Sequence, residues 1–243
     1  MAQQSTKEVR MYLRIRNLCG LLGILLPWIA LFAAAIAPHE SKEWWWSISA
    51  TYYLSPVALV GVLVPACIVM MSYIGYNWVD NLVTTLNGIA GLGIVLFPCK
   101  VNWIPDGTPV GFFQLPIELS SRIHMVCAIL FFLFAAFNTL FLFTRHGSTM
   151  TEKKKLRNRI YRFCGWGMLV LLALLIALSL IFGTPNWFVM IIEILLLHLF
   201  GFAWVVKGEF FPFLTDQAAA NGRSGSSTTR SRTDSSIRVE VDD

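Results

Sequence analysis

The chain alternates between long apolar stretches and short polar or turn-forming segments. Six apolar stretches can be recognised, over approximately residues 18–37, 56–76, 80–99, 122–144, 161–183 and 186–207. Each has roughly the length, about 20 helical residues at about 1.5 Å each, that crosses a hydrocarbon layer of about 30 Å. Backbone amides in lipid must be satisfied within the segment, and barrel strands would be shorter and alternating. The pattern therefore predicts an all-α bundle of six transmembrane helices.

Composition supports a bilayer as the surroundings of this chain. Of the 243 residues, 56% are hydrophobic and 14% are charged, and the mean hydropathy is +0.63. This is more apolar surface than one soluble core of this length would bury. The formal net charge of +5 could suggest nucleic acid, but the basic residues adjoin apolar stretches and form no basic domain interleaved with aromatic residues. We expect lipid and not nucleic acid as the partner.

The distribution of Lys and Arg gives the orientation. Six spans would place three of the nineteen on one side, namely Lys42, Lys100 and Arg122. The other sixteen are Lys7, Arg10, Arg14, Arg16, Arg145, Lys153, Lys154, Lys155, Arg157, Arg159, Arg162, Lys207, Arg223, Arg230, Arg232 and Arg238. The positive-inside rule predicts that both ends are cytoplasmic. Residues 1–17 then form a cytoplasmic segment, 18–207 the membrane domain and 208–243 a cytoplasmic tail.

The segments between and after the spans also carry signals. The apolar run of the first span is longer than that of a signal peptide and is followed by Pro38, so we expect it to be retained. Residues 38–55 and 100–121 contain aromatic runs that favour the outer membrane interface, such as Trp44-Trp45-Trp46. Short connections predict helical hairpins between spans two and three and between five and six. The polar composition from about residue 215 predicts disorder.

Polar residues within the third span form a stripe. Asp80, Thr84, Asn87 and Gly91 lie on one helical face. Such a stripe is typical of a packing seam between helices, and we expect Asn87 to form an interhelical hydrogen bond, with ligand contact as the alternative. Asp80, at the predicted cytoplasmic start of the helix, favours the helix N-terminus by its charge.

The most informative polar residue is Glu193, seven positions into the sixth span. An uncompensated carboxylate at this depth would be costly, so Glu193 is expected to be protonated or paired. His124, near the external start of the fourth span, is the first candidate partner. His198 lies about 140° round the helix from Glu193, which weakens a compact ligand motif. The candidate ligand-binding residues, all expected at an external site except for Asn87, are His124, Glu193, Ser47, Ser49, Tyr53 and Asn87.

Motifs for known chemistry are lacking in the sequence. It contains no GxSxG, glycine-rich phosphate loop, CxxC or HExxH pattern. Four histidines, of which His146 is predicted to be cytoplasmic, offer few ligands for zinc. We therefore predict no metal and no cofactor. Five scattered cysteines, Cys19, Cys67, Cys99, Cys127 and Cys164, are interpreted as small apolar packing residues.

Several short motifs resemble those of a family of uncharacterised bacterial multi-pass membrane proteins. In the first half they are Ser47-Ile48-Ser49-Ala50-Thr51-Tyr52-Tyr53, Tyr73-Ile74-Gly75-Tyr76 with Asp80-Asn81, Ala90-Gly91 and Phe97-Pro98. In the second half they are Ile123-His124, Ala128-Ile129-Leu130-Phe131-Phe132, Arg159-Ile160-Tyr161-Arg162, Cys164-Gly165, the Glu193 to His198 spacing and Phe202-Ala203-Trp204-Val205-Val206-Lys207. The resemblance covers about residues 15–210. It implies a multi-pass location in the cell (inner) membrane and no established activity.

A weaker likeness leads to the ceramidase and adiponectin-receptor-like membrane hydrolases. Members of that superfamily use a serine, an aspartate and three histidines around zinc, including an HxxxH pair, on seven spans. This chain has six predicted spans and no HxxxH, and Asp80 is expected at the end away from His124. A non-catalytic binding or scaffold protein with a small external polar site is the favoured function. A metal-dependent lipid hydrolase and a small-solute or proton-coupled transporter are the alternatives, so whether the protein is an enzyme stays open.

Overall fold

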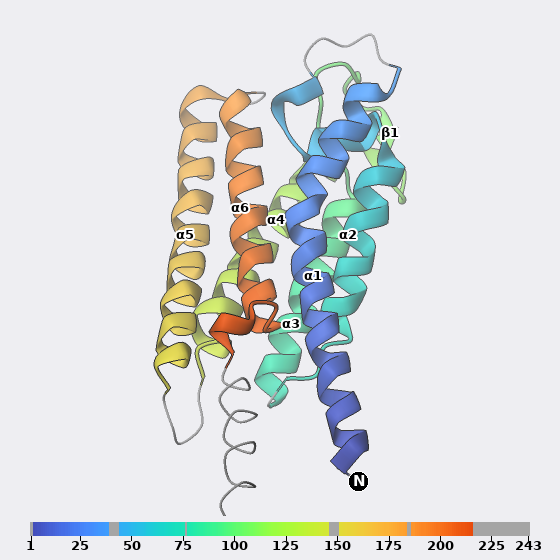
Figure 1. Cartoon of the computed structure of the whole chain (residues 1–243). Coiled ribbons are helices and arrows are strands. Elements are labelled where there is room, and N and C mark those ends of the chain that lie inside the picture. Colours follow the sequence, from blue (N-terminus) through green and yellow to red (C-terminus); the bar gives the residue numbers. More distant parts are fainter. Residues whose placement is uncertain (1, 39–43, 76, 146–150, 184–185, 216–243) are drawn as a thin grey trace, which may run out of the picture.

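A computed structural model describes residues 2–38, 44–75, 77–145, 151–183 and 186–215. Within these residues the chain is mostly helical, and its six α-helices confirm the predicted all-α class (Figure 1). They are α1 (Ala2–Ile36), α2 (Pro56–Met71), α3 (Trp78–Leu96), α4 (Ile117–Phe137), α5 (Glu152–Phe182) and α6 (Trp187–Lys207). All but α2 are long and apolar enough to cross a membrane. The 16 residues of α2 extend over about 24 Å.

Short elements join the helices. The 3₁₀ helices η1 (Trp44–Trp46) and η2 (Ser49–Tyr53) precede α2, and η4 (Pro212–Leu214) follows α6. A π-helical segment, η3 (Asn138–Leu142), continues α4. Strands β1 (Pro109–Val110) and β2 (Leu115–Pro116) form an antiparallel hairpin with Val110 opposite Leu115. The two aromatic loops are therefore partly ordered by local structure.

The helices alternate in direction between two ends of the bundle. In Figure 1, α1 starts at the lower end and finishes at the upper end, where η1, η2 and the β hairpin also lie. We use "upper end" for the end where α1 and α3 finish and α4 and α6 begin. Helix α1 packs against α6 and α2, α2 against α3, α3 against α4, and α5 against α6. The predicted α2–α3 and α5–α6 hairpins are thus confirmed.

Helices α1, α4 and α5 begin before the predicted stretches, and α2 and α3 end before theirs. Helix α2 ends at Met71 and not near residue 76, because the chain turns sharply into α3. At this turn a Cβ on Gly75 would lie 2.2 Å from the Cβ of Asp80, and the Gly75 N–H donates to the Asn81 side chain at 2.6 Å. Helix α3 ends at Leu96 and not at Cys99, since Pro98 has no N–H to continue it.

The α1–α6 contact depends on two glycines. A Cβ on Gly201 would lie 2.5 Å from the backbone oxygen of Gly20 and 2.8 Å from the backbone nitrogen of Ile24. Side chains at this crossing would hold the two backbones apart. Small residues allow such close approach between membrane helices, and here they position the helix that carries Glu193.

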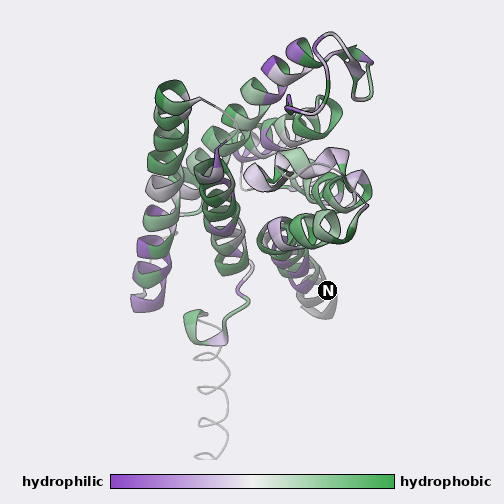
Figure 2. Cartoon of the chain, turned by 90° about the horizontal axis from the view of Figure 1, so that it is seen from above, coloured by the Kyte–Doolittle hydropathy of each residue, from purple (hydrophilic) through white to green (hydrophobic). Residues whose placement is uncertain are grey.

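Large apolar side chains cover the outside of the bundle. On α5 these include Val170, Leu180 and Phe182, each more than 60% exposed. Figure 2 shows hydrophobic residues along most of the helices and hydrophilic residues near the start of α5. A soluble surface rarely presents such wide apolar patches, so these helices are those of a multi-pass membrane protein.

The polar stripe on α3 packs inside the bundle, as predicted. Asp80, Thr84, Asn87 and Gly91 are all buried. The predicted interhelical hydrogen bond of Asn87 is wrong, because its side-chain oxygen and nitrogen have no hydrogen-bond partner among the described residues. Asp80 does more than favour the helix N-terminus: its carboxylate forms a 2.8 Å ion pair with Arg145, which follows η3. This ion pair could not be predicted from the sequence, because it joins residues that only the tertiary fold brings together.

Candidate functional site

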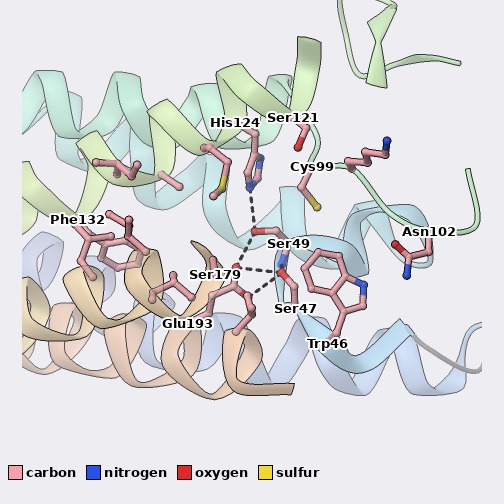
Figure 3. A pocket seen from close by; sticks show the side chains of 18 residues that line it. Trp46, Ser47, Ser49, Cys99, Asn102, Ser121, His124, Phe132, Ser179 and Glu193 are labelled. Carbon is pink, nitrogen blue, oxygen red and sulfur yellow. Dashed lines mark hydrogen bonds between the residues drawn. The ribbon is translucent and has the colours of Figure 1, made fainter. Parts of the chain in front are cut away.

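A cavity of about 290 Å³ opens at the upper end of the bundle, between α4, α5 and α6 (Figure 3). The segment Trp46–Ser49 and the chain after α3 complete its walls. Its lining residues are Trp46, Ser47, Ser49, Cys99, Lys100, Asn102, Ser121, His124, Met125, Ala128, Ile129, Phe132, Leu172, Leu175, Ile176, Ser179, Val189 and Glu193.

The lining is divided by polarity. Aliphatic and aromatic side chains from α4 and α5, such as Phe132, Leu172 and Ile176, form an apolar wall. Ser47, Ser49, His124 and Glu193 gather at one side of the cavity (Figure 3). Concave, mostly apolar sites with a few convergent polar groups are the usual form of small-molecule binding sites.

The Glu193 carboxylate is held by donors from the segment Ser47–Ser49, at the start of η2. The Ser47 hydroxyl donates to Oε2 at 2.9 Å, and the Ile48 backbone N–H donates to the same oxygen at 2.6 Å. The Ser49 hydroxyl lies 3.3 Å from Oε1. Ser47 is itself oriented by the Ser49 N–H, which donates to its oxygen at 3.1 Å. These contacts tie the loop to α6 and place a half-buried acid at the cavity wall.

His124 is oriented by backbone carbonyls at the end of α3. Its Nδ1 lies 2.8 Å from the Phe97 oxygen and 3.1 Å from the Ile94 oxygen. The Ile94 carbonyl lacks its usual helical partner because residue 98 is proline. Since carbonyl oxygens only accept hydrogen bonds, Nδ1 carries a proton. Nε2 is therefore the ring nitrogen that can gain or lose a proton, and it faces the cavity.

Ser49 connects the histidine to the acid. His124 Nε2 lies 3.2 Å from the Ser49 oxygen, which in turn contacts Glu193. Figure 3 shows the Ser49 hydroxyl between the two side chains. The structure thus brings His124 and Glu193 to the same cavity wall, but the expected direct pair is instead a bridged one.

Two other candidates do not line the cavity. The Tyr53 hydroxyl donates to the Cys99 carbonyl at 2.7 Å and so supports the chain after α3. Asn87 lies on the buried face of α3. Neither is among the lining residues, so their expected ligand contact is not supported. His39, Glu40 and Glu43, which precede Trp46 in the chain, lie outside the described residues.

Lys100 and Cys99 add further polar atoms to the wall. Lys100 pairs with Asp106 at 2.6 Å, and this hydrogen bond raises the pKa of the lysine. Burial raises the pKa of the Cys99 thiol, so that it stays protonated and uncharged at neutral pH. Among the described groups that line the cavity, Glu193 is thus the one that can carry a negative charge at neutral pH.

Comparisons with known proteins identify no relative of this chain. No protein-family model, curated protein or solved structure matches the chain. The resemblance to bacterial multi-pass proteins accordingly stays a prediction, and function has to be argued from the site itself.

Ser49 and His124 also have the spacing of a nucleophile and its base. However, Glu193 takes the Ile48 N–H, a donor of the kind that would be needed to stabilise an oxyanion. A carboxylate beside the serine would also oppose the negative charge of a tetrahedral intermediate. Within the described residues, no three His, Cys, Asp or Glu side chains are grouped to hold a metal ion.

Sequence reasoning missed most of the cavity wall. Ser179 is the single polar residue in the second half of α5, and this was its available signal. The aliphatic wall residues give no such signal, because lipid-facing and cavity-facing side chains look alike in an apolar helix. Trp46 was expected at the interface with its neighbours, yet it is buried against the cavity. His198 contacts Trp28 of α1, whose indole N–H donates to Nε2 at 3.1 Å.

Proposed function

We propose that this protein binds a small single-chain amphiphile in the cavity between α4, α5 and α6. The observation that carries the proposal is the division of the lining into an apolar wall and a polar cluster. The apolar wall would contact a hydrocarbon chain, and the cluster around Glu193 would contact the head group. A non-catalytic binding role requires no further chemistry from these residues.

The polar cluster favours a head group that donates hydrogen bonds. A carboxylate offers about four acceptor positions, and Glu193 accepts from three described groups, Ser47, Ile48 and Ser49, which leaves about one position for a further donor. Lys100 is paired with Asp106, so the cavity has no strong preference for an anion. An amine or an alcohol head group is therefore preferred over a carboxylate.

Binding of decylamine, decanol and decanoate tests this proposal. We expect decylamine and decanol to bind purified protein in lipid nanodiscs, and decanoate to bind at least about tenfold more weakly, which corresponds to about 1.4 kcal/mol. Ala128→Phe should abolish binding because it fills the cavity. Radiolabelled ligand, corrected with empty nanodiscs, provides the measurement.

Ala173→Phe is the matched control for Ala128→Phe. Ala173 lies on the exposed face of α5 and does not line the cavity, so the added ring should leave affinity unchanged. Equal loss in both variants, or equal affinity for the amine and the carboxylate, would contradict the proposed site.

We further propose six spans with both ends in the cytoplasm of a cell whose plasma (inner) membrane holds the protein. Basic residues support this orientation: Arg16, Lys154 and Lys207 lie near the lower end, whereas the described basic residues of the upper end are Lys100 and Arg122 (Figure 1). The positive-inside rule then assigns the lower end to the cytoplasm. The cavity would open toward the external leaflet.

Cysteine labelling tests this orientation. In a variant whose native cysteines are replaced, a membrane-impermeant maleimide added to intact cells should label Asp106→Cys and leave Glu152→Cys unlabelled. Both positions are strongly exposed, at 72% and 85% of the side chain, so accessibility within the protein does not distinguish them. Permeabilised cells should label both. The reverse pattern in intact cells would show that the bundle has the opposite orientation in the membrane.

A further inference from the structure

We propose that Glu193, Ser49 and His124 form a proton relay that couples occupancy of the cavity to the protonation of the site. The coupling to ligand binding rests on the proposed function of the cavity. The relay itself depends only on the contacts among these three side chains. Its basis is the continuous chain of contacts from Glu193 Oε1 to the Ser49 hydroxyl at 3.3 Å and from there to His124 Nε2 at 3.2 Å.

The two ends of the chain can hold one proton in two arrangements. In the first, a protonated Glu193 donates to the Ser49 oxygen, and the Ser49 hydroxyl donates to the bare Nε2 of His124. In the second, the carboxyl proton has moved to Ser49 as the original hydroxyl proton moved to Nε2. The imidazolium then donates to Ser49, and Ser49 donates to the Glu193 carboxylate. Both arrangements contain the same atoms and the same net charge.

The orientation of His124 determines which of its nitrogens takes part in this exchange. Its Nδ1 proton is held by the Phe97 and Ile94 carbonyls, so a proton that arrives by way of Ser49 can bind at Nε2 alone. The donors Ser47 and Ile48 on the other side stabilise the carboxylate form of Glu193. Both ends are therefore prepared for the second arrangement, in which the proton is on His124 and Glu193 is a carboxylate.

Few other titratable groups face the relay. Cys99 and Lys100 line the same cavity from the segment after α3, and Lys100 pairs outward with Asp106. The lining residues from α5 and from Trp46–Ser49 contain no acid or base, and on α6 His198 turns toward Trp28. Glu118 on α4 instead accepts the Gly107 N–H at 2.9 Å. Glu193 and His124 are consequently the pair that determines the charge of the described cavity.

Binding of an ammonium ligand is then coupled to release of the proton that Glu193 and His124 share. With one proton shared, the pair is neutral overall, whereas loss of that proton leaves a net negative charge beside the cavity. An ammonium head group binds the deprotonated pair better, so its binding should release up to one proton. By linkage, its affinity should rise with pH by up to about tenfold per pH unit where the proton is lost.

Infrared titration of the Glu193 carboxyl band tests the relay without any ligand. The band is assigned by its absence in Glu193→Gln. His124→Gln removes the second proton site, and we expect the pH midpoint of the band to rise by about one unit or more, since a nearby imidazolium favours the carboxylate. The critical comparison repeats this shift in the Ser49→Thr and Ser49→Val backgrounds, which differ in the hydroxyl and are closely matched in shape.

The expected result is that Ser49→Thr keeps the shift caused by His124→Gln, whereas Ser49→Val reduces it at least threefold. Equal shifts in the two backgrounds, or no carboxyl band that depends on Glu193, would overturn the relay. Neither outcome depends on decylamine, so failure of the relay and failure of the proposed ligand site are distinguished. Ser121→Ala, at a cavity residue outside the chain of contacts, should leave the shift unchanged.

Discussion

Replacing Glu193 with alanine should both destabilise the protein and weaken binding of the amine. The substitution leaves the donors of Ser47, Ile48 and Ser49 without their acceptor. A buried donor without a partner costs about 1–3 kcal/mol, so a total loss on the order of 3 kcal/mol is expected. For a chain of this size this corresponds to roughly 10 °C in Tm. Thermal unfolding in detergent provides the measurement.

Loss of affinity should accompany the loss of stability. Hydrogen bonds to charged groups contribute about 1.5–3 kcal/mol, which predicts a decylamine affinity at least about tenfold weaker in Glu193→Ala. Glu118→Ala is the control, since Glu118 lies at the same end and accepts one backbone N–H from Gly107 in the exposed turn before β1. A Glu193→Ala variant as stable as Glu118→Ala would show that the Glu193 contacts contribute little.

Adding a single methyl group at Gly201 should disrupt the bundle. The new Cβ would lie 2.5 Å from the Gly20 oxygen and 2.8 Å from the Ile24 nitrogen, so backbones and not flexible side chains would have to move. Overpacking a tight interface costs about 1–3 kcal/mol, and more where backbones clash. We expect Gly201→Ala to lower Tm by roughly 10 °C or to prevent accumulation of folded protein, as measured by fluorescence-detected size-exclusion chromatography.

Gly61→Ala is the matched control for this effect. Gly61 is also within a helix, but nothing lies within 4 Å of the position that its Cβ would occupy. Alanine is favoured over glycine in helices by up to about 1 kcal/mol, so this variant should be as stable as the wild type or more stable. Similar behaviour of the two variants would contradict the close α1–α6 contact.

The helices could be predicted from the sequence because their cause is local. Apolar length predicts an element that crosses a membrane, and the structure contains a helix over each of the six stretches. The early ends at Met71 and Leu96 occur where a turn packs against a neighbour or where proline removes an N–H. Helices α1, α4 and α5 begin before their apolar stretches, because a helix can continue through polar residues outside the apolar run. The cavity walls on α5 depend on which face of an apolar helix packs inward, which composition does not determine.

The site was predictable in part. The similar depth of His124 and Glu193 in their helices indicated a shared site, since an acid in lipid requires a partner. The bridge through Ser49 was not predictable, because it depends on how the segment Ser47–Ser49 packs against the upper end of α6. Nor was the role of Pro98, whose missing N–H leaves the Ile94 carbonyl for His124. Both require the tertiary arrangement of segments far apart in the chain.

The position of a photocrosslinked amphiphile tests the central claim most directly. A decylamine analogue with a diazirine at the end of its chain, bound to protein in nanodiscs and activated by light, should attach to the apolar wall. We predict crosslinks at Leu172, Ile176 or Phe132, identified by mass spectrometry and suppressed by excess decylamine. Crosslinks confined to outward-facing residues such as Val170 or Leu180, and unaffected by excess decylamine, would contradict the cavity as a ligand site.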